Sequence, residues 1–149
     1  MKKVILYTDG ACSENPGVGG WAFVLQYKST QKKVAGGELL TTNNRMELKA
    51  VIEGLKALKE QCEVEVYSDS AYVVNAFKNE WIVSWQLNNW KNSQKKEVLN
   101  RDLWEELLDL VSKHKVSFIK VKGHQDNELN NLCDKMAVEQ VSILKSKNE

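Results

Sequence analysis

Four acidic residues stand where carboxylates could meet in the folded chain. Asp9 and Asp69 each follow a short apolar run, in the segments TDG and SDS. Glu47 lies in NNRMELKA and Asp134 in CDKMA, both within helix-like patterns. Carboxylate oxygens are the ligands that hard divalent cations such as Mg²⁺ and Mn²⁺ prefer. If brought together, the four acids would form a phosphodiester-cleaving metal centre, because two ions about 3.5–4 Å apart can clamp the attacking and leaving oxygens.

The two acids that follow apolar runs also have ordinary interpretations. Asp9 suits a turn before Gly10. Asp69 could cap a helix, a role that Ser68 or Ser70 would fill equally well. Both acids, however, leave the carboxyl ends of predicted strands, which is where open α/β sheets place their sites. If the two strands are neighbours in the sheet, the side chains of Asp9 and Asp69 converge.

The two acids on predicted helices are also ambiguous. Glu47 could complete a variant capping box that begins at Asn44, and Asp134 could be a solvated charge one turn after Asn130. At about 100° per residue, however, Glu47 falls at the edge of its helix's apolar stripe rather than opposite it. Two carboxylates about 4 Å apart repel by about 4 kcal/mol at an effective dielectric near 20, and a bound cation removes that conflict.

The chain contains two histidines. His124 lies in KGHQD, directly after the last predicted strand. A loop histidine is ordinarily a surface residue, but beside a metal cluster an imidazole with an unperturbed pKa of about 6.5 can carry protons. His114, in SKHKV, has no motif around it, and we interpret it as a surface residue.

The apolar pattern predicts the elements that must position these groups. Strands are predicted over residues 4–7, 21–27, 32–40, 64–67 and 116–121. Helices are predicted over residues 43–58, 70–77, 81–90 and 129–144, with a further helix opened by Asp102 that turns Leu103, Leu107, Leu110 and Val111 inward. The order predicts an α/β fold with a mixed five-stranded sheet, an antiparallel meander followed by parallel strands, and helices on both faces.

Composition adds few constraints on function. The 149 residues suit one domain, 1–149, whose last residues, 145–149, we expect to fray. The net charge of +1 says nothing about partners, and we expect a monomer. No apolar run is long enough to span a membrane. An odd number of cysteines without a CxxC motif indicates reduced thiols and a cytoplasmic protein; these are Cys12, Cys62 and Cys133.

The stretch 78–101 has a composition of its own. It carries five basic residues against two acids, together with Trp81, Trp85 and Trp90. Basic charge mixed with exposed aromatic rings is typical of surfaces that bind a polyanion with bases to stack. Trp81 and Trp85 are one helical turn apart and could instead pack together against the body of the protein. We expect the phosphate contacts to come from Lys91, Lys95 and Lys96.

Taken together, the motifs resemble a known family. TDGACSENPGVGGW, TTNNRMELKA, YSDSAYV, WIVSWQLNNWK, NRDLW and VKGH…N..CDKMA occur in the order found in ribonuclease H type 1, and the match is closest to the bacterial single-domain form with a basic protrusion. The resemblance implies an endonuclease that hydrolyses the RNA strand of RNA–DNA hybrids with two Mg²⁺ ions, for which Mn²⁺ can substitute. It implies metal ligands at Asp9, Glu47, Asp69 and Asp134, and it implies that His124 assists proton transfer and product release.

The same resemblance implies how the hybrid is held. Thr42 would help to seat a DNA phosphate, and residues 81–96 would grip the DNA strand. Amide side chains suit the region that checks for ribose, because they both donate and accept hydrogen bonds. Contacts to sugars and phosphates make cleavage nearly independent of sequence, and the products would carry 5′-phosphate and 3′-hydroxyl ends. The residues implied to line the hybrid are Cys12, Asn15, Thr42, Asn43 and Asn44.

Three other functions compete with this interpretation. One is another nuclease of the same superfold, such as a junction resolvase or an integrase-type catalyst, against which the TTNN segment and the Trp/Lys insert argue. A second is a non-catalytic nucleic-acid-binding module, which would gain from losing the four acids. A third is a Rossmann-like cofactor domain, suggested by Gly17-x-Gly19-Gly20, but the third glycine is misplaced and a strand follows instead of a helix.

Overall fold

The computed structural model describes residues 1–122 and 127–148. Its sheet has five strands in the order β3-β2-β1-β4-β5. The strands are β1 (Lys2–Cys12), β2 (Gly17–Tyr27), β3 (Thr30–Thr41), β4 (Cys62–Ser68) and β5 (Lys115–Lys120). The helices are α1 (Asn43–Lys56), α2 (Ala71–Lys78), α3 (Trp81–Leu87), α4 (Arg101–Ser112) and α5 (Glu128–Lys147). The strands β1, β2 and β3 pair antiparallel, whereas β4 pairs parallel with both β1 and β5, which confirms the predicted mixed sheet.

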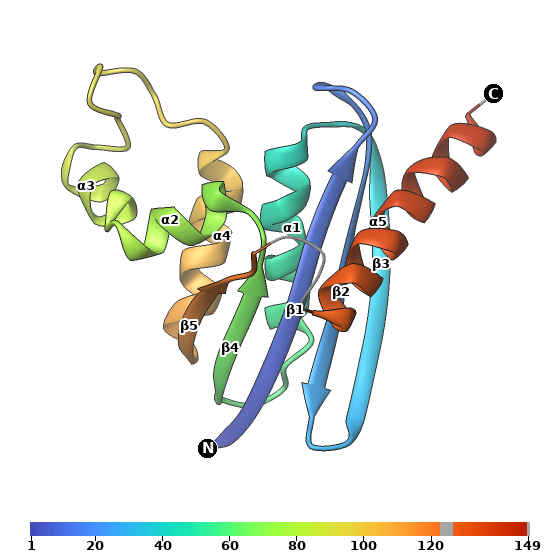
Figure 1. The fold of residues 1–149 in the computed structure, drawn as a ribbon. Coiled ribbons are helices and arrows are strands. Elements are labelled where there is room, and N and C mark those ends of the chain that lie inside the picture. The colour runs from blue at the N-terminus through green and yellow to red at the C-terminus, as the bar shows by residue number, and fades with distance from the viewer. Residues whose placement is uncertain (123–126, 149) are drawn as a thin grey trace.

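Helices cover both faces of the sheet, as predicted. Alternate side chains of a strand point to opposite faces, and Figure 1 shows α1 and α5 on opposite sides of β1 and β2. On one face, Leu6 and Phe23 join a large core that includes Trp104 of α4. On the other face, Ala22 and Val24 pack against α5 in a smaller core. The central strand β1 contacts both cores, since Leu6 is buried in the larger one and Tyr7 packs half-buried against the smaller one, which explains its continuous apolar run.

Several elements differ in length from their predicted ranges. The strands β1, β2 and β3 extend beyond their apolar runs, because the β1–β2 ladder continues as far as Cys12 and Gly19 and the β2–β3 ladder as far as Gly17 and Thr41. The helix α3 ends at Leu87, three residues early, since Asn89 and Trp90 adopt left-handed backbone angles. The helix α5 continues to Lys147, so residues 145–147, which we expected to fray, are helical.

The core position of Trp104 was missed by the sequence pattern. Its side chain is fully buried, and its indole Nε1 donates a hydrogen bond to the hydroxyl of Tyr72 at 3.0 Å. Of the four residues expected to face inward from this helix, Leu103 and Leu107 are buried, whereas Leu110 and Val111 are only half-buried. The buried part of α4 is therefore its N-terminal half, where Trp104 contacts Tyr72 of α2. Within residues 1–122 and 127–148, no helix has the length and apolarity needed to cross a membrane.

Candidate active site

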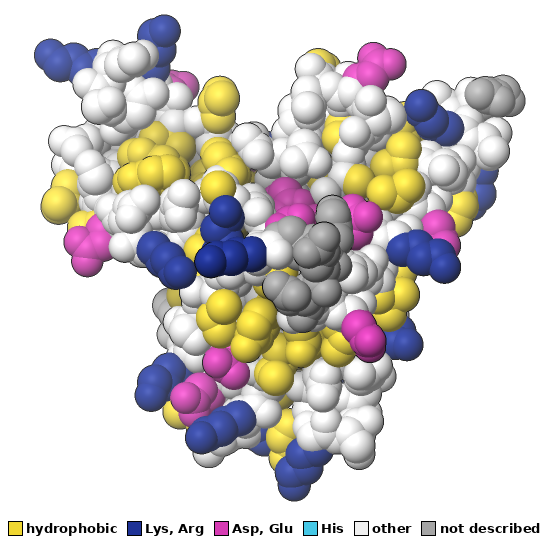
Figure 2. All heavy atoms as spheres, in the orientation of Figure 1, with side chains coloured by type: hydrophobic (Ala, Val, Ile, Leu, Met, Phe, Trp, Pro, Cys, Tyr) yellow, Lys and Arg dark blue, Asp and Glu magenta, His cyan; other side chains and the backbone are white. Residues whose placement is uncertain are grey.

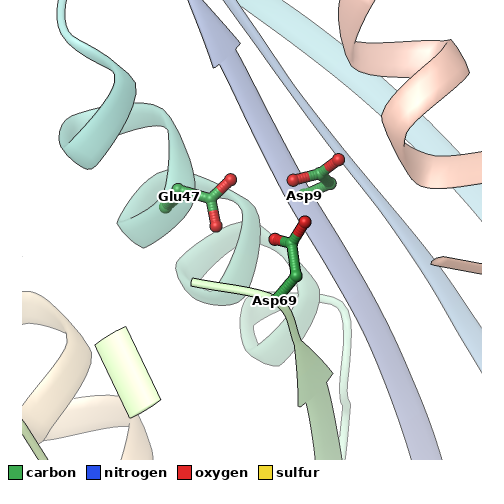
Figure 3. A group of neighbouring side chains, drawn as sticks. All are labelled: Asp9, Glu47 and Asp69. Carbon is green, nitrogen blue, oxygen red and sulfur yellow. The ribbon is translucent and has the colours of Figure 1, made fainter. Parts of the chain in front are cut away.

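Three of the four predicted carboxylates converge at one edge of the sheet. Asp9, Glu47 and Asp69 each offer an oxygen, and these atoms lie within 4.8 Å of one another. Figure 3 shows the three side chains pointing toward one another from β1, α1 and the end of β4. The parallel β1–β4 ladder ends at the pair Tyr7 and Tyr67, so Asp9 and Asp69 follow it at equivalent positions. The condition for convergence of Asp9 and Asp69, that their two strands be neighbours in the sheet, is therefore met.

Glu47 reaches this cluster because α1 crosses β1 very closely at Gly10. A Cβ atom at Gly10 would lie 2.5 Å from the backbone nitrogen of Glu47, so only glycine permits this approach. The Gly10 N–H donates to Glu47 Oε1 at 2.6 Å and to Asp9 Oδ1 at 2.9 Å. One backbone donor thus positions two of the three carboxylates.

The capping roles considered for the acids belong to other residues. The N-cap of α1 is Thr42, whose Oγ1 accepts from the Arg45 N–H at 3.3 Å, so the capping box between Asn44 and Glu47 is wrong. The N-cap of α2 is Ser70, whose Oγ accepts from the Val73 N–H at 3.2 Å. Neither Glu47 nor Asp69 is therefore needed to begin its helix.

Asp134 lines the same cavity as the three converging acids. This cavity, here called the carboxylate cavity, has a volume of about 420 Å³ and is lined by Asp9, Gly10, Asn43, Asn44, Glu47, Asp69, Ser70, Ala71, Tyr72 and Asp134. Asp134 comes from α5, whose first turn is tied to the sheet by Asn130. The Asn130 amide donates to the carbonyls of Thr8 on β1 and Tyr67 on β4. Figure 2 shows acidic side chains at the base of a hollow between two lobes of the molecule.

Burial makes the charged form of the carboxyl groups in this cluster unfavourable. Asp9 and Glu47 are only 6% and 4% exposed. Burial, together with the nearby carboxylates of Asp69 and Asp134, raises the pKa of Asp9 to about 7. Burial also raises the pKa of Glu47 well above its ordinary value, with an added contribution from the adjacent Asp9 carboxyl group. A cation among these oxygens would remove the penalty, because it favours the charged form of every carboxylate.

The oxygen atoms of the cluster suit a hard divalent cation. Glu47 Oε2 is buried and has no hydrogen-bond partner among the described residues. A buried carboxylate oxygen without a partner is costly, and metal coordination would satisfy it. Because the cluster offers oxygen ligands only, it fits Mg²⁺ or Mn²⁺ better than Zn²⁺, which favours nitrogen and sulfur ligands.

A second cavity continues from the carboxylate cavity toward the start of α4. This cavity, here called the amide groove, has a volume of about 470 Å³ and is lined by Asn15, Thr42, Asn43, Asn44, Leu99 and Asn100. Asn43 and Asn44 line both cavities. The structure thus brings together four of the five residues that the family resemblance implied to line the hybrid. The fifth, Cys12, lies at the end of β1, where its thiol donates to the Thr41 carbonyl at 3.4 Å.

Residues 79–100, here called the protrusion, combine a packed base with exposed charge. The ring of Trp85 packs edge-on against Trp104, with 5.4 Å between ring centroids, and lies tilted against Trp90 at 6.4 Å, so its area is partly structural. Trp81 is 40% exposed. The three lysines expected to meet phosphates are all exposed, on a loop closed by a bridge between Lys91 and Glu97; they are Lys91, Lys95 and Lys96.

Of the two histidines, only His114 lies within the described residues. His124 lies outside the described residues, so its proposed role stays a prediction. The interpretation of His114 as a plain surface residue is wrong. Its ring is half-buried, and Nδ1 accepts a hydrogen bond from the Cys62 N–H at 3.1 Å, which links the end of α4 to the start of β4. Burial accordingly lowers the pKa of His114.

Several groups around the site were not singled out from the sequence. Arg45 forms a bidentate ion pair with Asp102, with N–O distances of 3.0 and 2.8 Å, which joins the starts of α1 and α4. Asn100 accepts from Arg45 and donates to the hydroxyl of Tyr72, which lines the carboxylate cavity. The segment NRDLW contributed to the family resemblance, but nothing in its pattern indicated that its polar residues join two helices at the site.

Comparison with known proteins agrees with this geometry. A profile of the RNase H family matches residues 1–142. Ribonuclease H of Thermoanaerobacter sp. (strain X514) is 64% identical over 138 residues, which cover 93% of this chain and 89% of that protein. This chain belongs to the RNase H family. Ribonuclease H of Caldicellulosiruptor saccharolyticus is 62% identical over 137 residues, covering 92% of this chain and 94% of that protein. As a member of the RNase H family, the protein is a hydrolytic enzyme that cuts RNA.

Solved structures match the fold in the same way. A type 1 RNase H with the type 2 active-site motif superposes with a TM-score of 0.83 and 27% identity, covering 95% of this chain and 72% of that one. An RNase H1 solved in complex with an RNA/DNA hybrid superposes with a TM-score of 0.71 and 21% identity, covering 95% of this chain and 98% of that one. At that identity, the second match supports the fold alone.

Proposed function

We propose that this RNase H hydrolyses the RNA strand of RNA–DNA hybrids, with two Mg²⁺ ions held by Asp9, Glu47, Asp69 and Asp134. The observation that carries the proposal is the meeting of buried carboxylates with a groove lined by amides. The carboxylates favour a divalent cation, and Asn43 and Asn44, which line both cavities, can recognise a ribose hydroxyl of the strand beside the acids. A duplex lying across both cavities would present one strand to the acids and the other to the amide groove.

The residues of the chain have separable tasks in this reaction. When bound, the two ions would activate a water molecule and stabilise the departing oxygen. Asp9 and Glu47 are held for this task by the Gly10 N–H, and Asp69 by the end of β4. His124, whose role rests on sequence alone, would carry a proton. The products would then have 5′-phosphate and 3′-hydroxyl ends.

Substrate binding is assigned to the groove and the protrusion. Asn43 and Asn44 lie between the two cavities, where they can check the ribose of the strand to be cut. Exposed lysines on the protrusion would neutralise phosphates of the DNA strand, with little dependence on base sequence. The further proposed contacts are Cys12, Asn15, Thr42, Trp81 and Trp85, with Lys91, Lys95 and Lys96. We further propose a single-domain monomer that acts in the cytoplasm.

A substrate panel tests the proposal directly. A labelled RNA–DNA hybrid is incubated beside RNA–RNA, DNA–DNA and four-way junction DNA substrates, with Mg²⁺ and with chelator. We expect cutting of the RNA strand of the hybrid alone, only with the metal, and products with a 5′-phosphate. Asp109→Asn is a matched control, because Asp109 is an exposed acid paired with Lys113. Cutting of the junction but not of the hybrid would reverse the proposal in favour of a resolvase.

A further inference from the structure

Asn130 of α5 lies where the two central parallel strands part. The β1–β4 ladder ends at the pair Tyr7 and Tyr67. Directly beyond this pair, the side-chain amide of Asn130 donates to the Thr8 carbonyl at 3.4 Å and to the Tyr67 carbonyl at 3.2 Å. A primary amide can serve both acceptors because it carries two N–H groups. Asn130 therefore bridges β1 and β4 at the edge of the sheet where the acids converge.

Two further contacts anchor α5, and both are made to other strands. The Cys133 thiol donates to the Tyr7 carbonyl of β1 at 3.4 Å. Farther along the helix, α5 crosses β2 so closely that a Cβ atom at Gly20 would lie 2.2 Å from the Ala137 carbonyl oxygen. These two contacts hold the helix against β1 and β2. Of the three anchors, Asn130 alone reaches β4, so it determines how the first turn of α5 approaches that strand.

The position of Asp134 depends on these anchors. Asp134 lies one helical turn after Asn130, on the same side of the helix. The other three acids come from β1, α1 and the end of β4, whereas Asp134 enters the carboxylate cavity from α5, on the opposite face of the sheet from α1 (Figure 1). A displacement of the first turn of α5 would therefore move Asp134 relative to the other acids and leave those acids in place.

One atom of Asn130 indicates a task beyond stabilising the fold. The residue is only 9% exposed, and its Oδ1 has no hydrogen-bond partner among the described residues. A buried polar atom without a partner is unfavourable, and this offsets much of what the two donated hydrogen bonds contribute. Stability alone is therefore a weak reason for an asparagine at this position. Side chains that break a packing rule in this way are typical of functional sites.

We propose that Asn130 is a positioning residue for the metal site. By bridging the carbonyls of Thr8 and Tyr67, it holds the first turn of α5 against β4 and keeps Asp134 beside the other three carboxylates. Asn130 acts only through Asp134, since its own amide donors are taken by the two carbonyls. The inference rests on the proposed function, because it takes Asp134 as a metal ligand.

Calorimetric titration with Mg²⁺, in the absence of nucleic acid, tests this proposal. Asn130→Ala removes both donated hydrogen bonds, and we expect it to raise the Mg²⁺ dissociation constant about tenfold, because residues that orient a metal ligand have effects of this size. Asn130→Leu fills the space that alanine leaves empty and should show the same loss. Once Asp134→Asn is present, adding Asn130→Ala should change the dissociation constant less than about twofold, since both substitutions act through the same ligand.

Asn127→Ala is the matched control, because it loosens the same turn of α5 without removing the bridge. The Asn127 side chain caps the helix by accepting from the N–H groups of Leu129 and Asn130, both at 3.2 Å. Its loss should lower the unfolding midpoint in chelator and keep the Mg²⁺ dissociation constant within about twofold of wild type.

Three results would overturn the role of Asn130. These are wild-type Mg²⁺ affinity in Asn130→Ala and Asn130→Leu, an equal loss of affinity in Asn127→Ala, and an undiminished effect of Asn130→Ala in the presence of Asp134→Asn. A wild-type protein that binds no Mg²⁺ would instead overturn the proposed metal assignment, so the two failures are distinguishable.

Discussion

The carboxylate cavity and the protrusion differ in how their charged groups are held. In the cavity, Asp9 and Glu47 are almost fully buried and share one backbone donor, so their positions depend on tight packing of α1 against β1. On the protrusion, Lys91 and Lys95 are exposed on a loop, and only its base is packed, through Trp85 against the core. Buried charges act strongly at short range, whereas exposed charges act weakly and are screened by salt. The cavity is therefore suited to chemistry and the protrusion to binding.

The largest expected effect comes from removing one buried charge. Asp9→Asn should lower the rate of RNA cleavage by about a thousandfold or more, since metal binding and water activation depend on that carboxylate. Hybrid binding should stay within about twofold of wild type, because the groove and the protrusion are untouched. Single-turnover cleavage and a binding titration in Mg²⁺ measure the two quantities separately. Near-full activity in Asp9→Asn would falsify the metal assignment.

A smaller effect is expected from disturbing the packing without removing a charge. Gly10→Ala places a Cβ atom 2.5 Å from backbone atoms of Met46 and Glu47, so α1 must move away from β1. A displacement of about 1 Å in a catalytic group can cost about a hundredfold in rate. The measurement is cleavage at saturating hybrid, with circular dichroism to verify the fold. Wild-type activity in this variant would show that the close approach of α1 is not required.

On the protrusion, the expected change is in binding rather than in rate. Neutralising Lys91, Lys95 and Lys96 together should weaken hybrid binding about tenfold at low salt and leave the rate at saturation unchanged. The slope of the logarithm of the binding constant against the logarithm of salt concentration should also become less steep, by up to about 0.9 for each phosphate that the variant no longer neutralises. Binding titrations over a salt series measure this, and Lys145→Gln with Lys147→Gln on α5 is a control that removes two positive charges away from the protrusion. An unchanged salt slope contradicts phosphate binding by these lysines.

The smallest expected effect is on stability and depends on the buried carboxyl group of Asp9 in the carboxylate cavity. Folding raises the pKa of Asp9 to about 7, above an ordinary value near 4. The native state therefore binds that proton more tightly, so the contribution of Asp9 to stability is complete below about pH 4 and is lost as the pH rises through about 7. In chelator, the free energy of unfolding of Asp9→Asn minus that of wild type should increase over this window.

Urea unfolding at several pH values measures that difference. Added Mg²⁺ should reduce it, since a cation bound to the wild-type cluster stabilises the charged carboxylates. Asp109→Asn is the control variant, because Asp109 is an exposed acid that does not line the carboxylate cavity. A difference that does not vary with pH would contradict the raised pKa.

Much of the candidate site could be predicted from residue types and their positions in the chain. The acids at Asp9 and Asp69 follow apolar runs, and Glu47 lies at the edge of an apolar stripe, so their places on strands and a helix could be derived. The order of elements predicted a mixed sheet with helices on both faces. These features are local, because hydrophobic periods of 2 and about 3.6 residues depend only on neighbours in the chain.

Other features depended on contacts between distant segments. Nothing local indicated that Trp104 fills the core or that His114 accepts a hydrogen bond from the start of β4. The caps of α1 and α2 were ambiguous among several Ser, Thr, Asn and Asp residues, since all of these can cap a helix. Leu99 was not singled out, because an isolated leucine in a polar loop carries no periodic signal.

The family, the set of acids and the types of element that carry them follow from the order of residues in the chain. Three further facts needed the folded molecule: Asp9 and Asp69 follow adjacent parallel strands, Gly10 lets Glu47 reach the same point, and Leu99 lies in the amide groove. The physical reason is that side-chain periodicity encodes which face of an element is buried. Which elements become neighbours, and at what distance, is decided by the packing of the whole chain.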